Sequence, residues 1–145
     1  EAAYRRLARR GVEPFPGVRR WLAWFGAQRY RQALASSATM ENIAATLQGL
    51  DIWPWFDCIV TGARLAASKP DPAIFLDAAA GLGLTPDRCL VIEDSIAGVQ
   101  AAKRAGMACL AVTNTRPAHD LAVADLIVAS LEDVSEAQME RLLQR

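Results

Sequence analysis

The 145-residue sequence lacks the features of several protein classes. It has no apolar run long enough to cross a membrane, and its charged start predicts no signal peptide. Its 16 basic and 16 acidic residues leave no net charge, so we expect no binding to nucleic acid or to an anionic membrane. Cys58, Cys89 and Cys109 lie far apart and form no Cys-x-x-Cys pair. We therefore expect buried free thiols in a reducing, cytoplasmic setting.

The sequence also has only one histidine and lacks a glycine-rich nucleotide-binding string. The only histidine, His119, follows Arg116-Pro117 in an expected loop, and we expect it at the surface without a catalytic role. No Gly-x-Gly-x-x-Gly string follows an expected strand, which argues against a nucleotide-binding Rossmann module. The glycines at 81 and 83 lie at an expected helix end, where glycine is typical of a C-cap.

What the sequence does contain is a regular alternation of apolar strands and amphipathic helices. Helices are expected at 18–28, 40–48 (ended near Gly49), 73–80, 97–105 and 135–144, and residues 1–10 resemble a helix end. Strands are expected at 30–35, 58–60, 89–92, 108–112 and 126–128. This alternation predicts an α/β fold, a Rossmann-like three-layer sandwich with a mainly parallel sheet. Ligands of such sheets bind at the carboxyl ends of the strands.

Two serines, Ser36 and Ser37, directly follow the first expected strand. Hydroxyls at a strand end that opens a helix can donate to an anion, and the free N–H groups of the helix start add to the effect. The alternative is that Ser37 or Thr39 only caps the helix that follows.

A lysine, Lys69, lies in the Ser-Lys-Pro-Asp-Pro string at 68–72. Pro70 restricts the lysine to extended conformations, so the loop is stiff. A lysine on a stiff loop can bring a fixed positive charge to a phosphate, although a surface lysine in an ordinary turn is the alternative.

An acidic pair, Glu93 and Asp94, follows the apolar strand 89–92. Two carboxylates at the end of a buried strand are costly to leave unpaired. Carboxylate oxygens are the ligands that Mg²⁺ prefers, together with waters and a substrate phosphate. Capping of the next helix is the alternative role. The three clusters together predict that Ser36, Lys69 and Asp94 converge on one pocket for a phosphate and a divalent cation.

These strings resemble motifs two, three and four of haloacid dehalogenase-like hydrolases, in the branch of beta-phosphoglucomutase and sugar phosphatases. The matching strings are at 33–37 (Ala-Leu-Ala-Ser-Ser), 68–75 (Ser-Lys-Pro-Asp-Pro-Ala-Ile-Phe) and 91–102 (Val-Ile-Glu-Asp-Ser-Ile-Ala-Gly-Val-Gln-Ala-Ala). The resemblance implies Mg²⁺-dependent phosphoryl transfer on a small phosphorylated metabolite through an aspartyl-phosphate.

The resemblance also implies a role for each candidate residue. Ser36, with Ser37 beside it, would bind the transferring phosphate, and Lys69 would neutralise the phosphate and the nucleophile. Asp94 would bind Mg²⁺ directly or through water. Glu93 would be a second Mg²⁺ ligand or an outer-shell partner that contacts a ligand rather than the metal.

The sequence departs from this family at its first motif. That motif is an Asp-x-Asp string on the opening strand, and no Asp-x-Asp occurs in this chain. Residues 1–16 are interpreted as the tail of the helical cap region with a linker, and residues 17–145 as an incomplete core domain. The family resemblance places the missing strand in the centre of the sheet, between the strands that end at Ser36 and at Asp94. We therefore expect an open gap, filled by a longer natural chain, a second polypeptide or an oligomer partner.

Two functions follow from the sequence. The first is a phosphatase or phosphomutase of this family that is inactive as the isolated chain, because the attacking carboxylate is missing. The alternative is a non-catalytic fragment or remnant that binds phosphate or another protein.

Overall fold

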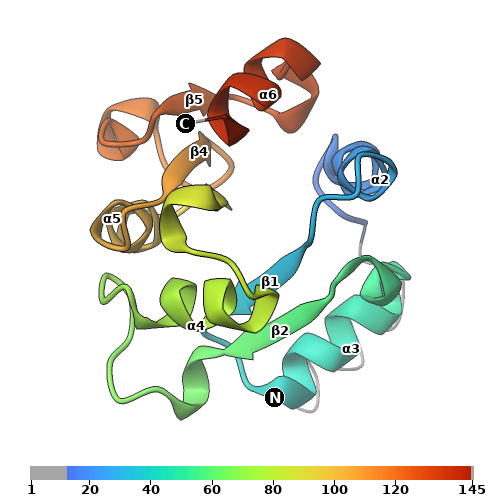
Figure 1. Ribbon diagram of the computed structural model, residues 1–145, viewed down its shortest axis with the longest axis vertical. Coiled ribbons are helices and arrows are strands. Elements are labelled where there is room, and N and C mark those ends of the chain that lie inside the picture. The colour runs from blue at the N-terminus through green and yellow to red at the C-terminus, as the bar shows by residue number, and fades with distance from the viewer. Residues whose placement is uncertain (1–12, 145) are drawn as a thin grey trace.

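The computed structural model describes residues 13–144 as alternating helices and strands (Figure 1). The helices are α2 (Val18–Ala27), α3 (Met40–Leu50), α4 (Ala73–Leu82), α5 (Ile96–Arg104) and α6 (Glu136–Leu143). The strands are β1 (Ala33–Ser36), β2 (Cys58–Thr61), β3 (Leu90–Glu93), β4 (Ala108–Val112) and β5 (Leu126–Val128). The predicted alternation is confirmed. The helix end expected at residues 1–10 lies outside the described residues.

The five strands form two parallel sheets. Strand β1 pairs with β2, and the second sheet has the order β3-β4-β5. No described strand lies between β1 and β3, which are the two strands that flank the gap expected from the sequence. The α/β class with parallel strands is therefore confirmed, and the interruption divides the sheet in two.

Helices cover both faces of the second sheet. Along β4, Cys109 and Ala111 join the core formed with α4 and α5, which includes Val99. The alternate residue Leu110 joins the core formed with α2 and α6, which includes Trp21. Because side chains of a strand alternate between its faces, this pattern places β4 in the middle of three layers.

A third core lies under α3 and fixes where that helix ends. The helix continues past Gly49 to Leu50, and Asp51 adopts a left-handed conformation with φ of 52°. The N–H of Ile52 then donates to the carbonyl of Leu47 at 3.2 Å. Leu50 and Ile52 are buried in this core, so packing rather than the glycine decides the end of the helix.

The remaining expectations about single residues are met in part. Cys109 is a buried free thiol, whereas Cys58 and Cys89 are free but only half-buried. Burial raises the pKa of Cys109 to about 12, so its thiol stays neutral. His119 lies at the surface, with its side chain 81% exposed and 3.1 Å from Asp120. Among residues 13–144, no helix combines the length and the apolar character needed to cross a membrane.

Candidate functional site

Glu93, the last residue of β3, is the centre of a network of hydrogen bonds. One carboxylate oxygen forms an ion pair with the ammonium of Lys69. The other accepts from the N–H groups of Asp94 and Ser95, both at 2.9 Å, and from the Ser95 hydroxyl at 2.9 Å. Burial acts to raise the pKa of Glu93, but the charge of Lys69 and the hydrogen bonds from Lys69 and Ser95 outweigh it and hold the pKa below its usual value.

Lys69 is held in place by the stiff loop that carries it. Its side chain is only 14% exposed, so it is not a surface lysine in an ordinary turn. Its Nζ lies 4.9 Å from the centre of the Phe75 ring, within the range of a cation–π contact. In the same loop, Asp71 accepts from the N–H of Ala73 at 2.9 Å, and the carbonyl of Pro70 accepts from Arg104 at 3.1 Å. Both contacts tie the loop to helices and fix the ammonium beside β3.

Asp94 differs from its neighbour because its carboxylate is available. Its backbone carbonyl accepts from the hydroxyl of Thr115 at 2.9 Å, which holds the residue in place. Within residues 13–144, no hydrogen bond or ion pair reaches its side-chain carboxylate. Among residues 13–144, both carboxylate oxygens of Glu93 therefore accept hydrogen bonds, whereas the carboxylate of Asp94 accepts none.

Gly98 is a part of this site that the sequence analysis did not single out. It lies in the first turn of α5, where its N–H donates to the Ser95 hydroxyl at 3.0 Å. A Cβ at this position would overlap the carboxylate of Glu93. The only sequence signal is a glycine in the first turn of a helix, where glycine is otherwise unfavourable. Because Gly98 has no side chain, it leaves room for the Glu93 carboxylate at the start of α5.

Ser36 and Ser37 lie at the carboxyl end of β1. The Ser36 oxygen accepts from the N–H of Ala38 at 3.2 Å, and Ser37 is exposed. Thr39 is the N-cap residue of α3 but forms no side-chain cap, so neither Ser37 nor Thr39 acts as the simple cap considered above. A Cβ on Gly62, at the end of β2, would lie 3.1 Å from the Cα of Ser37. The serine turn therefore packs closely against the end of the neighbouring strand.

The structure brings some of the predicted residues together and leaves others apart. Lys69 and Glu93 are in direct contact, and Asp94 is adjacent. A cavity of about 420 Å³ separates β1 from β3 and has Glu93 in its lining, but Ser36, Lys69 and Asp94 do not line it. The expectation that these three share one pocket is not met by this cavity.

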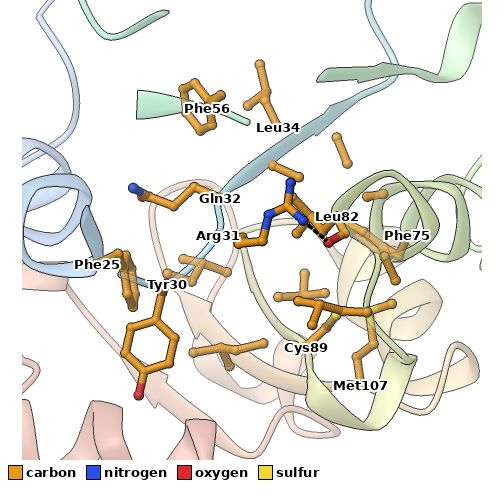
Figure 2. Close-up of a pocket in the computed structure, with 18 of the residues that line it drawn as sticks. Phe25, Tyr30, Arg31, Gln32, Leu34, Phe56, Phe75, Leu82, Cys89 and Met107 are labelled. Atoms are coloured by element: carbon orange, nitrogen blue, oxygen red, sulfur yellow. Dashed lines mark hydrogen bonds between the residues drawn. The ribbon is translucent and has the colours of Figure 1, made fainter. Parts of the chain in front are cut away.

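Figure 2 shows the residues that surround this cavity. Phe25 and Tyr30 lie on the side of α2, and Phe75, Leu82 and Met107 lie opposite them. Residues of β1 and β3 also line the cavity, together with further residues of the helices and loops around it. The cavity is therefore mostly apolar and lies between the two strand edges.

A profile of the family described as haloacid dehalogenase-like hydrolase matches residues 1–112 of this sequence. The chain belongs to the haloacid dehalogenase-like hydrolase family. Two curated relatives are a haloacid dehalogenase-like hydrolase domain-containing protein of Arabidopsis thaliana and the beta-phosphoglucomutase of Bacillus subtilis. The first is 37% identical over 97% of this chain and 46% of its own length. The second is 39% identical over 83% of this chain and 51% of its own length.

Solved structures of the family share the fold. A CbbY mutant from Rhodobacter sphaeroides, crystallised with xylulose-1,5-bisphosphate, superimposes with a TM-score of 0.85 at 27% identity. The match covers 90% of this chain and 60% of that one. The chain thus spans about half the length of the two curated relatives, at 46% and 51%. The predicted membership of the beta-phosphoglucomutase and sugar-phosphatase branch is confirmed by these matches.

The residues of this chain fit a magnesium site only in part. Mg²⁺ is usually bound through one or two carboxylates, with waters and phosphate oxygens completing the octahedron. Asp94 offers one such carboxylate. No group of three or more metal-ligating side chains is found between residues 13 and 144, and both oxygens of Glu93 already accept hydrogen bonds. The described residues therefore supply one ligand rather than a complete site.

Proposed function

We propose that this chain is the phosphate-binding part of a Mg²⁺-dependent phosphoryl-transfer enzyme that acts on a small phosphomonoester such as a sugar phosphate. The observation that carries the proposal is the partly buried Lys69–Glu93 pair at the carboxyl end of β3, beside Asp94, whose carboxylate has no hydrogen-bond partner among residues 13–144. The proposal is supported by relatives named as a beta-phosphoglucomutase and as a protein crystallised with a sugar bisphosphate.

Lys69 supplies the positive charge in this proposal. An ammonium carries three N–H donors, and Glu93 takes one of them. The remaining donors can bind phosphate oxygens, and the pairing with Glu93 keeps the charge in one place. Glu93 is thus a positioning residue that acts through Lys69, not a group that touches the substrate.

Ser36 supplies a neutral donor. Its oxygen accepts from the N–H of Ala38, which leaves the hydroxyl hydrogen free to donate to a phosphate oxygen. Ser37, exposed in the same turn, is a second donor to the same group. Asp94 would bind Mg²⁺, which supplies charge stabilisation to the phosphoryl group when bound.

The isolated chain is proposed to bind phosphate without turning it over. Residues 1–145 contain no Asp-x-Asp string, and covalent phosphoryl transfer by this route needs an attacking carboxylate. That absence is also the observation that favours the second candidate, a non-catalytic remnant that binds phosphate. The two candidates differ in whether a longer form of the protein hydrolyses phosphomonoesters.

The binding claim is tested by calorimetric titration of inorganic phosphate into the 145-residue chain, with and without Mg²⁺. Lys69→Gln should weaken binding by about 10- to 100-fold, because a charge-assisted hydrogen bond contributes about 1.5–3 kcal/mol. Asp94→Asn should remove the effect of Mg²⁺. Lys103→Gln is the matched control, because Lys103 also forms a partly buried ion pair, with Asp125 at 2.7 Å, but at the amino end of β4.

Two results would contradict the proposal. Equal phosphate affinity of the Lys69→Gln and Lys103→Gln variants would remove Lys69 from the site. Release of phosphate from a panel of sugar phosphates by the isolated chain would mean that the nucleophile lies among the residues of this chain.

A further inference from the structure

Thr61, the last residue of β2, is bonded to the turn at residues 36–38 that follows β1. The two strands lie side by side (Figure 1), and their parallel register pairs Thr61 with Ser36. The Thr61 hydroxyl donates to the carbonyl of Ala38 at 2.6 Å. A carbonyl oxygen can only accept, so the direction of the hydroxyl proton is fixed. Thr61 is therefore tied to this turn by a short hydrogen bond of defined direction.

Ala38 links Thr61 to Ser36 through its two backbone groups. Its carbonyl accepts from Thr61, and its N–H donates to the Ser36 oxygen at 3.2 Å. The N–H of Ala63 donates to the Thr61 oxygen at 3.3 Å, which orients the threonine hydroxyl toward Ala38. A hydroxyl has a single hydrogen to donate. Thr61 has therefore given its hydrogen to Ala38, whereas Ser36 only accepts in this chain of bonds and keeps its own for a ligand.

Gly62, the next residue along the chain, approaches the same turn closely. A Cβ at this position would lie 3.1 Å from the Cα of Ser37 and 3.5 Å from the backbone oxygen of Ser36. Carbon atoms in favourable contact are about 3.5–4.0 Å apart, so the first of these distances leaves no room for a side chain. Two consecutive residues at the end of β2 therefore contact the turn, Thr61 through a hydrogen bond and Gly62 through its backbone.

A small cavity leaves the turn room to move on one side. It has a volume of about 190 Å³, and its lining includes Thr61 and the residues that follow the turn, Thr39 and Met40. Thr39 forms no side-chain cap on α3, so its hydroxyl does not anchor this side. Well-packed interiors hold a segment in place by filling the space around it. Here that space is open, and the hydrogen bond from Thr61 replaces packing as the restraint.

We propose that Thr61 is a positioning residue for phosphate binding, which holds the turn at residues 36–38 so that the Ser36 hydroxyl stays in place to donate to the anion. The inference rests on the proposed function, because it requires a phosphate bound at Ser36. Thr61 does not touch the phosphate but acts through Ala38 and Ser36. Removing its hydroxyl should therefore lower the phosphate affinity of the folded chain, and the loss should depend on the presence of Ser36.

The test is a calorimetric titration of inorganic phosphate into variants of the 145-residue chain, without Mg²⁺. Thr61→Val keeps the branched shape but removes the hydroxyl, and it should weaken phosphate binding by about 3- to 10-fold, the net contribution of one hydrogen bond. Thr61→Ser keeps the hydroxyl and should bind within about twofold of the wild type. Thr61→Ala also lacks the hydroxyl, should weaken binding like Thr61→Val, and repeats the measurement if Thr61→Val does not fold.

A control and a double-mutant cycle separate positioning from a general loss of stability. Thr46→Val is the matched control, because the Thr46 hydroxyl also donates to a backbone carbonyl, that of Asn42 at 2.9 Å, but within α3. It should leave phosphate affinity within about twofold of the wild type, even where it lowers the melting temperature. In a Ser36→Ala background, Thr61→Val should change the affinity by less than about twofold, because the group that it positions is absent.

Several results would overturn the inference while the proposed function stands, because the wild-type chain would still bind phosphate. These are wild-type affinity in the variants that lack the Thr61 hydroxyl, equal affinities of Thr61→Val and Thr61→Ser, an equal loss in Thr46→Val, and additive losses in the double-mutant cycle. A wild-type chain that binds no phosphate would overturn the proposed function and this inference together. The wild-type titration therefore tells the two failures apart.

Discussion

The substitution Glu93→Gln tests whether the Lys69–Glu93 pair is a built part of the protein. Gln keeps the shape of the side chain but removes its charge, so it leaves the ammonium of Lys69 without a counter-ion. The two side chains are only 14% and 10% exposed for Lys69 and Glu93. Surface ion pairs contribute about 0–1 kcal/mol, whereas removing one partner of a buried pair costs about 3–5 kcal/mol.

We expect a loss near the lower end of that range, about 3 kcal/mol in the free energy of unfolding. Some exposure remains, and the Phe75 ring still faces the ammonium at 4.9 Å. The Ser95 hydroxyl and two N–H groups also lose a charged acceptor, but the amide oxygen of Gln can still accept from them.

Urea denaturation of the wild-type chain and of the Glu93→Gln variant measures this loss directly. Asp120→Asn is the control, because it breaks the pair with His119, whose side chain is 81% exposed, and should cost less than about 0.5 kcal/mol. A loss for Glu93→Gln that is no larger than the loss for Asp120→Asn would refute the account of a partly buried, structurally required pair.

Three further predictions concern the same region and the core. Gly98→Ala should destabilise the chain by about 1–3 kcal/mol because its Cβ overlaps Glu93; in a Glu93→Ala background the loss should largely vanish, and additive losses in a double-mutant cycle would refute the clash. The lowered pKa of Glu93 means that its stabilisation is present above the unfolded pKa of about 4.3 and is lost as the pH falls through the folded value. Unfolding free energies of wild type and Glu93→Gln should therefore converge in acid, and a constant difference would contradict this. The pKa of Cys109, raised to about 12, means that stability is present below pH 9 and is lost as the pH rises toward 12. Relative to Cys109→Ala, the wild type should lose about 2 kcal/mol between pH 9 and about 10.5, and parallel pH profiles would refute the burial of the thiol.

Much of the fold could be predicted from local sequence patterns. The strand at 108–112 was expected from its apolar run, and the structure has β4 at the same residues. Its burial on both faces follows from a sequence without polar positions. The end of α3 was expected near Gly49 but lies at Asp51. Local glycine preference is weak beside the burial of Leu50 and Ile52, which is decided by tertiary packing.

The candidate site was predictable in residue type but not in bonding. The pairing of Lys69 with Glu93 joins residues far apart in sequence, and no local pattern specifies it. The residue pattern predicts Glu93 and Asp94 as an acidic pair but not their hydrogen bonds, whereas the backbone at the start of α5 directs N–H groups to Glu93 alone. This difference depends on the conformation of Asp94 and Ser95, and on the space at Gly98, which only coordinates reveal.

The expected gap in the sheet came from the family resemblance and not from periodicity. Helix and strand periodicity predicts that β1 and β3 are strands, but it does not predict which strands lie next to each other in a sheet. The open edges became visible only when the pairing of each strand was known. The predicted common pocket for Ser36, Lys69 and Asp94 is not the cavity between the two sheets, because that cavity is lined by other residues.

The central proposal is that residues at the carboxyl ends of β1 and β3 bind one anion together. Its most direct test is a nuclear magnetic resonance titration of the 145-residue chain with inorganic phosphate and Mg²⁺, read at each backbone amide. The account predicts shifts that saturate together at residues 36–38, at Lys69 and at residues 94–95. Shifts at only one of these places, or shifts centred on Arg31 and Arg88 at the amino ends of the strands, would contradict it.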